Sequence, residues 1–408
     1  EIISRFAKRA FRRPVAKDEV DRLTTLYAMA RKDGDSFERS IKVALSAVLI
    51  SPHFLFRGEI QPEPDNPRAV HPINEFALAS RLSYFIWSTM PDDRLFELAE
   101  KKTLRKNLAA EITRMLKDPR ARALVDNFAN QWLQIRNLAS MTPDPKLYPG
   151  WDNELRDSMR KETEMFFENL MRENRSVLEL IDANYSFLNE RLARHYGVDG
   201  VKGSEFQKVV FKDNKRGGIL TQGSILTITS NPTRTSPVKR GKWILENIVG
   251  SPPPPPPPDV PELEEAKEAK GSLRERMEKH RENAMCASCH ARMDPIGFGF
   301  ENYDGVGKWR DKDGAYSVDA GGKLLSGEDF RDAGELKKIL ADKKRDEFLQ
   351  CLASKMLTFA LGRGMEYYDR PSIDGIVKRM SKNQYRFSAL VEGVVNSPAF
   401  QLRRGEGD

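Results

Sequence analysis

One short segment carries residues whose order fits covalent chemistry: Cys286-Ala287-Ser288-Cys289-His290. Two thiols separated by two residues can add to the two vinyl groups of one haem, and the following histidine can bind the iron on its proximal side. One helical turn would place both sulfur atoms along one edge of the haem. The spacing therefore predicts one covalent haem c, attached through Cys286 and Cys289, with His290 as axial metal ligand.

Three other uses of this segment fit less well. A structural zinc site needs four ligands, and the chain has only one further cysteine, Cys351. A thioredoxin-like dithiol expects a βαβ context, which the sequence does not show. A disulfide across two intervening residues has poor geometry. Haem attachment remains the preferred interpretation.

The second axial ligand of the iron is open. His280 is our first candidate metal ligand, although a bend near Asn283 is needed to bring it over the distal face. Met365 and then Met356 follow, because they lie downstream of the motif, where many c-type cytochromes place a distal methionine. An iron with an open sixth position is the remaining alternative.

Residues on both sides of the motif fit a haem pocket. Ser272 and Glu275 form a capping box that predicts a helix running towards His280. A backbone carbonyl near Pro295 is expected to accept a hydrogen bond from the proximal histidine. Arg310 is a candidate ligand for a haem propionate. Apolar side chains after the motif can cover a haem face: Ile296, Phe298 and Phe300.

Helices must position this segment, because helical spacing of apolar residues dominates the first two-thirds of the chain. The pattern predicts helices over 37–50 and 151–174, a helix capped by Asn74, and another that starts at Pro91-Asp92. Strand signals are short, at 208–211 and in a hairpin around Asp313-Gly314. We expect a mainly α, multi-domain helical body with a small cytochrome c-like module and minor β hairpins.

Seven consecutive prolines, 252–258, mark the clearest boundary in the chain. Such a run favours a stiff polyproline II rod, which we interpret as a spacer, with a docking site for a proline-binding partner as the alternative. The predicted domains are an N-terminal helical domain (1–60), a second helical domain (70–198), the haem module with the proline run (205–312) and a C-terminal helical domain (320–402).

Composition limits the classes of function. The 408 residues carry 67 basic and 60 acidic side chains, and the net charge of +7 is dispersed along the chain. We therefore expect no nucleic-acid partner. No apolar run approaches the length of a membrane span. The chain begins without methionine, so upstream sequence, a signal peptide included, is expected to be missing.

Other polar residues fit structural or solvent-exposed roles better than ligand-binding ones. Asp311, Asp313 and Asp319 lack the spacing of an EF-hand loop, and a solvated hairpin is preferred. The acidic residues of the helix over 151–174 are expected to form a solvated face: Glu162, Glu164 and Glu168. We expect structural roles for three single histidines and for the remaining thiol: His53, His71, His195 and Cys351.

The chain resembles the large planctomycete-type cytochrome proteins, in which a cytochrome c-like module is embedded among cytochrome-associated domains of unknown function. The resemblance rests on four stretches: 6–14 with Ser51-Pro52-His53-Phe54-Leu55, 78–88 with 189–197, 235–243 with the proline run and the C-x-x-C-H motif, and 357–364. It implies haem and an exported, periplasmic protein. The family pattern keeps His-Arg at His280-Arg281, which supports His280 as a ligand.

The resemblance implies no established reaction. Our first hypothesis is an electron-transfer protein whose helical body docks a redox partner protein. The second is a haem enzyme of the peroxidase, oxidase or dehydrogenase kind, acting on an organic substrate, for which a carbohydrate is our first candidate. The third is a surface-assembly protein in which haem is ancillary. The sequence leaves the oligomeric state open.

Overall fold

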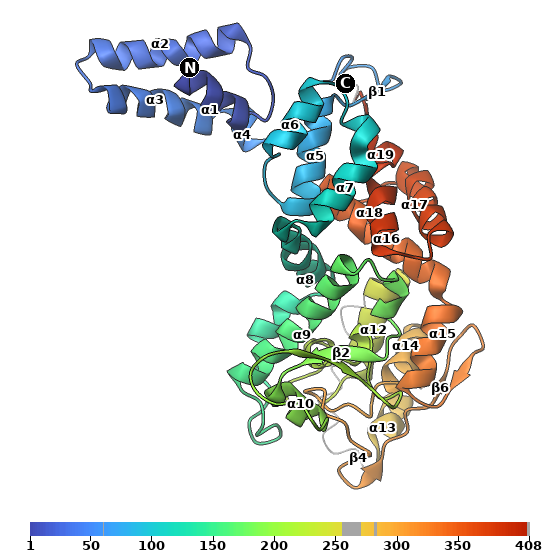
Figure 1. Ribbon diagram of the computed structural model, residues 1–408. Coiled ribbons are helices and arrows are strands. Elements are labelled where there is room, and N and C mark those ends of the chain that lie inside the picture. Colours follow the sequence, from blue (N-terminus) through green and yellow to red (C-terminus); the bar gives the residue numbers. More distant parts are fainter. Residues whose placement is uncertain (60, 255–270, 281–283, 406–408) are drawn as a thin grey trace. The chain divides into compact units, whose positions relative to one another are not determined.

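The computed structural model describes residues 1–59, 61–254, 271–280 and 284–405, and it divides into two compact units. Unit 1 comprises Glu1–Leu124, Leu357–Gly375 and Val391–Asp408, and unit 2 comprises Val125–Met356 and Ile376–Leu390. Both units are built mainly from helices, with short antiparallel strand pairs (Figure 1). The prediction of a mainly α, multi-domain body with minor hairpins is confirmed. Among the helices described, none combines the length and apolar character needed to cross a membrane.

Unit 1 contains α1 (Ile2–Ala10), α2 (Lys17–Lys32), α3 (Phe37–Leu49), α4 (Pro52–Leu55), β1 (Val70–Pro72), α5 (Glu75–Trp87), α6 (Asp93–Glu100), α7 (Leu108–Lys117), α19 (Pro398–Gln401) and β8 (Leu402–Arg404). Unit 2 contains α8 (Asn130–Trp132), α9 (Asn153–Arg172), β2 (Tyr185–Leu188), α10 (Glu190–Tyr196), β3 (Gln207–Val210), α11 (Gly223–Ile228), α12 (Pro237–Ile244), α13 (Leu273–His280), α14 (Ala284–Phe298), β4 (Lys312–Asp313), β5 (Tyr316–Ser317), β6 (Gly322–Lys323), β7 (Asp329–Phe330) and α15 (Ala333–Asp342). Three helices are divided between the units: α16 (Arg345–Leu361), α17 (Arg370–Lys382) and α18 (Phe387–Val395).

Short 3-10 and π turns connect these elements: η1 (Arg105–Asn107), η2 (Pro119–Arg122), η3 (Leu124–Ala129), η4 (Ile135–Ser140), η5 (Val177–Leu180), η6 (Ile219–Thr221), η7 (Leu245–Val249) and η9 (Tyr367–Asp369). The strands pair as β1 with β8, β2 with β3, β4 with β5 and β6 with β7, all antiparallel. The two strand signals in the sequence are thereby confirmed as β3 and as the β4–β5 hairpin.

The predicted helix starts are confirmed where a side chain caps the first turn. Asn74 accepts the amide of Ala77 at 2.8 Å at the start of α5, and Asp92 accepts the amide of Leu95 at 3.0 Å at the start of α6. These caps act over three residues, so the local sequence is enough to find them.

The core of unit 1 has two parts. Leu23, Ala44 and Val48 pack α2 and α3 against α1. Helix α5 is buried around most of its circumference, and Phe85 lies 6.3 Å from Phe359 and 6.0 Å from Phe400 between ring centroids. Residues from both ends of the sequence therefore close this core.

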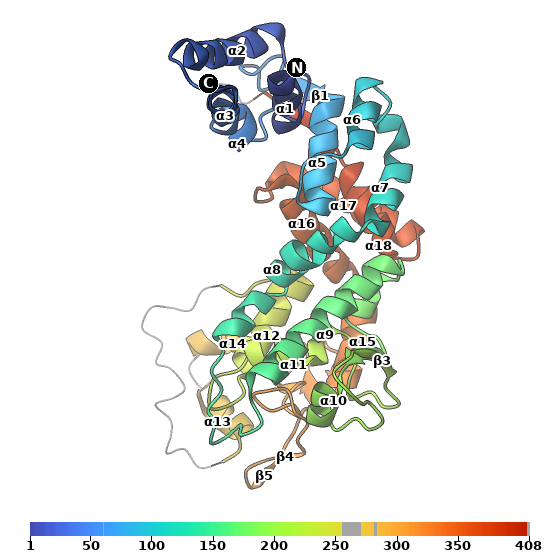
Figure 2. The same cartoon turned by 60° about the vertical axis from the view of Figure 1, so that its left-hand side comes forward.

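The core of unit 2 surrounds the long helix α9. Its apolar face packs on the antiparallel β2–β3 pair and on α10, with Met159, Leu188 and Leu192 fully buried. Helices α12 and α14 lie side by side in two views that differ by 60° (Figure 1, Figure 2). This second pair is the scaffold of the C-x-x-C-H segment.

Candidate functional site

The segment Cys286–His290 lies in the first half of α14. Cys289 is half-buried, and the side chain of His290 is 16% exposed. The backbone of Cys286 and Cys289 is helical, as predicted, and the side chain of Cys286 lies outside the described residues. Cys289 and His290 are thus neither fully covered nor fully exposed.

His290 is oriented by Asp294, one helical turn further along α14. Its Nδ1 lies 3.0 Å from Oδ1 and 3.1 Å from Oδ2 of Asp294, whose side chain is completely buried. A carboxylate can only accept a hydrogen bond, so Nδ1 of His290 carries the proton and donates. The imidazole is held in one tautomer, with Nε2 as the nitrogen suited to bind iron.

The expectation of a carbonyl partner near Pro295 is wrong for this structure. The carbonyl of Pro295 accepts the amide of Gly299 at 3.2 Å, and the Asp294 carboxylate takes the imidazole instead. The spacing of four residues on a helix could have revealed this pair, because side chains at i and i+4 are neighbours.

Two glycines allow α12 and α14 to cross with their backbones in contact. A Cβ atom at Gly241 would lie 2.0 Å from the carbonyl oxygen of Met293, and one at Gly297 would lie 1.9 Å from the carbonyl oxygen of Pro237. Neither contact is possible for another residue type without moving a helix. The crossing fixes α14, and hence His290, relative to α12.

Gly297→Ala is expected to destabilise the protein by about 3 kcal/mol, because the new methyl group must push α12 and α14 apart. Gly375→Ala is the matched control: Gly375 lies in α17, has no neighbouring atom within 4 Å of a Cβ, and should gain about 0.5–1 kcal/mol from the better helix former. Urea unfolding of both variants measures the difference. Equal effects of the two substitutions would contradict the role of Gly297.

Helix α13 packs against the same pair of helices. Leu273 and Met277 form a cluster with Phe298, and the Arg274 guanidinium lies 4.1 Å from the centroid of the Phe298 ring. The first two turns of α13 therefore lie beside the end of α14.

The capping box that begins α13 is confirmed. The Glu275 amide donates to Ser272 Oγ at 3.3 Å, and the Ser272 amide donates to Glu275 Oε2 at 2.7 Å. The side chain of His280 and the bend expected near Asn283 lie outside the described residues. Met356 is completely buried in unit 2, and Met365 belongs to unit 1.

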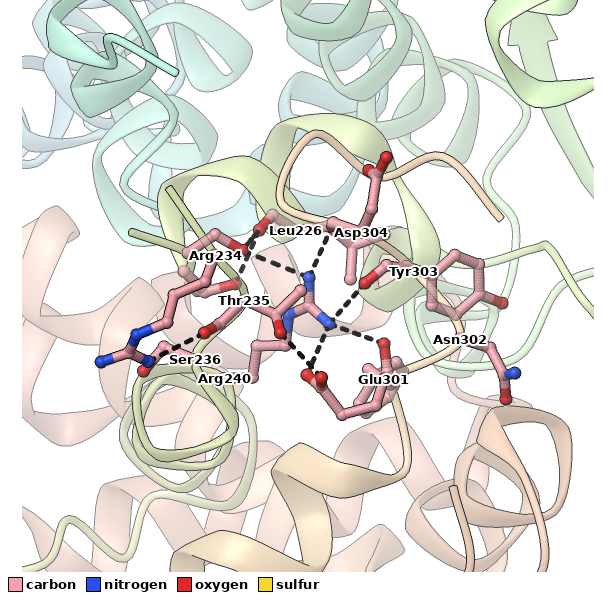
Figure 3. A network of polar contacts seen from close by, with 12 residues as sticks. Leu226, Arg234, Thr235, Ser236, Arg240, Glu301, Asn302, Tyr303 and Asp304 are labelled. Carbon is pink, nitrogen blue, oxygen red and sulfur yellow. Dashed lines mark hydrogen bonds and ion pairs between the residues drawn. The ribbon is translucent and has the colours of Figure 1, made fainter. Parts of the chain in front are cut away.

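A buried arginine organises the chain that follows α14 (Figure 3). Arg240 of α12, 2% exposed, donates to the carbonyls of Phe300, Tyr303 and Asp304 at 2.6, 2.9 and 2.8 Å. Its guanidinium also lies 3.2 Å from the Glu301 carboxylate. Burial raises the pKa of Glu301, while Arg240 and Arg310 oppose that rise. One side chain thus fixes the irregular backbone of residues 300–304.

Arg310 lies in this network. Its guanidinium contacts Glu301 Oε2 at 3.0 Å, Asp313 Oδ1 at 2.6 Å and Thr235 Oγ1 at 3.2 Å. The structure therefore gives Arg310 two carboxylate partners within the protein. A role towards a haem propionate stays a prediction, and it would require exchange of the contact with Asp313, whose side chain is 44% exposed.

The proline run begins beside the C-x-x-C-H helix. Arg292 of α14 donates to Ser251 Oγ at 2.5 Å and to the Ser251 carbonyl at 3.3 Å. Of the predicted rod, residues 252–254 are described and the rest lies outside the described residues.

The third cysteine is buried as expected, and burial raises the pKa of the Cys351 thiol to about 11.

Part of the acidic face expected on α9 is instead buried. Glu162 is 1% exposed and Glu164 is 4% exposed, so the prediction of a solvated face is wrong for both. Glu162 accepts hydrogen bonds from Ser186 and Tyr196, each at 2.6 Å. Glu162 lies three residues after Met159 and four before Phe166, so it is on the apolar face of α9. This helical spacing could have predicted its burial.

Burial raises the pKa of Glu162 to about 7 and lowers the pKa of His195, which faces the Val306 carbonyl at 2.8 Å, to about 4. Between pH 4.5, the ordinary pKa of a glutamate, and pH 7, the folded protein keeps a proton on Glu162 that the unfolded chain has lost. The contribution of Glu162 to stability therefore falls as pH rises towards 7. His195 acts oppositely: its contribution is full above the unfolded value of 6.5 and falls as pH drops towards 4.

Glu162→Gln is expected to remove the loss of stability that ionisation of Glu162 causes as pH rises towards 7 and above. Gln keeps both hydrogen bonds, since its amide can donate to Ser186 and its carbonyl can accept from Tyr196. Between pH 5 and pH 8 the wild type should lose roughly 3 kcal/mol relative to the variant. Denaturant unfolding across this range measures it. Glu154→Gln, an exposed site on α9, is the control, and identical profiles for all three proteins would contradict the prediction.

Together these observations define a mainly α protein in which the C-x-x-C-H helix crosses α12 in close backbone contact. The sequence matches four family models described as proteins of unknown function: DUF1595 over 1–59, DUF1592 over 73–198, PSCyt3 (DUF1588) over 216–313 and DUF1585 over 326–400. These are the planctomycete cytochrome-associated domains, so the chain carries the domain set of that family. No curated protein and no solved structure matches the sequence.

The PSCyt3 match contains α12, α14, the Arg240 network and the C-x-x-C-H segment. None of the four descriptions names a haem or an activity. In the part of the chain that the structure describes, no group of three or more His, Cys, Asp or Glu side chains could hold a metal ion by itself. The porphyrin provides four nitrogen ligands, so a haem iron needs only one or two ligands from the protein and does not require such a group.

Proposed function

We propose that this chain is an exported c-type haem protein that transfers electrons to or from a redox partner protein. The supporting observation is the pairing of His290 with the buried Asp294 within the C-x-x-C-H helix. A buried carboxylate on the outer nitrogen of a histidine is the arrangement that orients metal-binding imidazoles in proteins. Cys286 and Cys289 would hold the haem by thioether bonds, and His290 would be its axial ligand.

The residues present fit this group. The thiol of Cys289 and the ring of His290 are partly accessible, whereas Asp294 and the third cysteine are buried. When bound, the haem supplies a one-electron redox centre. The protein's part is to hold the proton of His290 on Nδ1 and to keep α14 fixed through Gly241 and Gly297.

The experiment is expression of the chain behind an export signal in a host that matures c-type cytochromes. The purified protein is expected to be coloured, and its intact mass after extraction of unbound haem should include one porphyrin. A colourless protein with the mass of the bare chain would overturn the proposal.

A haem enzyme is the second candidate function. The observation that favours it is again the Asp294 carboxylate, since a partner of this kind makes the axial imidazole a stronger electron donor. Carbon monoxide added to the reduced protein separates the two functions. A rapid Soret shift would indicate an open iron and favour the enzyme, and an unchanged spectrum would favour electron transfer with a second ligand, for which His280 is our first candidate.

A further inference from the structure

A cavity of about 1070 Å³ lies in unit 1 and shares no lining residue with the C-x-x-C-H site. Segments far apart in the sequence line it: 11–14, 53–59, 72–81, 99–105 and 360–361 together with Arg403. A volume of this size exceeds what a drug-sized ligand needs, since binding sites for small molecules are typically about 300–1,000 Å³. The cavity is therefore large enough for an organic ligand.

The charge of the lining is strongly one-sided. Two carboxylates, Glu59 and Glu75, face seven basic side chains: Arg12, Arg13, Arg57, Arg81, Lys102, Arg105 and Arg403. Glu59 pairs with Arg81 at 2.5 Å and Arg403 at 3.4 Å, and Glu75 pairs with Arg105 at 3.7 Å. Outside the lining, Glu19 pairs with Arg13 at 2.8 Å.

Three cations of the lining have no carboxylate within ion-pair distance among the residues described: Arg12, Arg57 and Lys102. Arg12 is 6% exposed, and its guanidinium donates to the carbonyls of His53 at 2.9 Å and Phe56 at 2.8 Å. Both bonds come from Nη2, and they leave the charge of the guanidinium uncompensated. A buried charge without a counter-charge is costly, and an anion in the cavity would offset that cost.

Arg12 and Arg57, both lining residues, also lie near the ring of Tyr84, which is not part of the lining. The two guanidinium carbons lie 5.7 Å (Arg12) and 5.2 Å (Arg57) from the ring centroid of Tyr84. Two like charges next to one aromatic ring attract an oxyanion more strongly than either does alone. The position of Arg12 is also special in the backbone, because it adopts a left-handed φ of 56° that is uncommon for arginine.

The remaining walls are apolar, with side chains of Phe11, Phe56, Phe76, Ile73 and Leu361. Phe56 is 67% exposed despite its size, so it offers apolar surface that nothing in the described chain covers. We propose that this cavity binds a small organic molecule with two or more oxyanion groups on an apolar body, held by Arg12, Arg57 and Lys102. This proposal does not depend on the proposed haem.

Calorimetric titration of the full chain at low ionic strength tests the proposal, on protein with and without haem. The probes are benzene-1,3,5-tricarboxylate, benzene-1,3-diyl bisphosphate and inorganic sulfate. We expect saturable one-site binding of an aromatic anion, and its identity distinguishes carboxylate from phosphate recognition. Sulfate should bind more weakly, because it lacks an apolar body. No saturation by either aromatic probe up to millimolar concentration would overturn the proposal, as would equally tight binding of sulfate.

The Arg57→Gln/Lys102→Gln variant is expected to bind at least roughly tenfold more weakly, because a hydrogen bond to a charged group contributes about that much affinity. The control, Arg194→Gln/Lys202→Gln, removes the same charge from exposed sites of unit 2, whose side chains are 73% and 83% exposed. Arg57→Lys keeps the charge and should keep most of the binding, which separates charge from folding. Equal weakening in the variant and the control would contradict the assignment of the cavity.

Discussion

Replacement of both Cys286 and Cys289 by Ala is expected to reduce covalently bound haem from one per chain to none. The thioether bonds are the only covalent links that the motif offers to a porphyrin. The remaining thiol, Cys351, is 5% exposed in α16, and its pKa is raised to about 11 by burial, so it is a poor nucleophile at neutral pH. Intact mass of the exported protein, after extraction of unbound haem, measures the outcome.

Cys351→Ala is the matched control, because it removes one thiol and leaves the motif intact. Its haem content should equal that of the wild type. A double variant that still carries the mass of a porphyrin would show that attachment uses another residue. If Cys351→Ala instead lost its haem, the buried thiol would have to be assigned a role in the site.

Part of the fold and part of the site were predictable because their signals are local. The C-x-x-C-H order, the capping box of Ser272 and Glu275 and the cap at Asn74 each join residues within four positions of one another. Such contacts depend on the helix alone, and no knowledge of the tertiary structure is needed to find them.

The contacts that fix the site in space were not predictable in the same way. Arg240 and Glu301 are far apart in the sequence, and nothing in either neighbourhood indicates that a salt bridge is buried there. The same holds for the glycines at 241 and 297, because each is required only by the backbone of the other helix that packs against it. These roles depend on which residues lie close together in the folded protein, and local sequence patterns do not indicate that.

Glu162 and Asp294 form an intermediate case. Both lie on helices, and both occupy positions whose spacing from a neighbour was readable: Glu162 from Met159 and Phe166, and Asp294 from His290. For Glu162, the expectation that acidic residues on a charged helix face solvent outweighed that spacing, and for His290 a carbonyl near Pro295 was expected as the partner instead of Asp294. Buried carboxylates with partners are the informative exceptions.

Asp294→Asn is expected to raise the midpoint potential of the haem. The Asp294 carboxylate is fully buried and lies 3.0 Å from Nδ1 of His290, so its charge makes the imidazole a stronger donor and favours the ferric iron. Asparagine keeps an oxygen that accepts the Nδ1 proton but removes the charge. Loss of such a partner changes metal affinity by about 10- to 100-fold, and if that change falls on the ferric state it corresponds to roughly 60–120 mV for one electron.

Spectroelectrochemical titration of the Soret band measures the potential in the wild type and in two variants. Asp342→Asn makes the same chemical change at an exposed position of α15, where solvent and salt screen the charge. Its potential should stay close to that of the wild type. Equal potentials in Asp294→Asn and Asp342→Asn would mean that the carboxylate does not hold the axial histidine once haem is attached, and the proposed function would lose the observation that supports it.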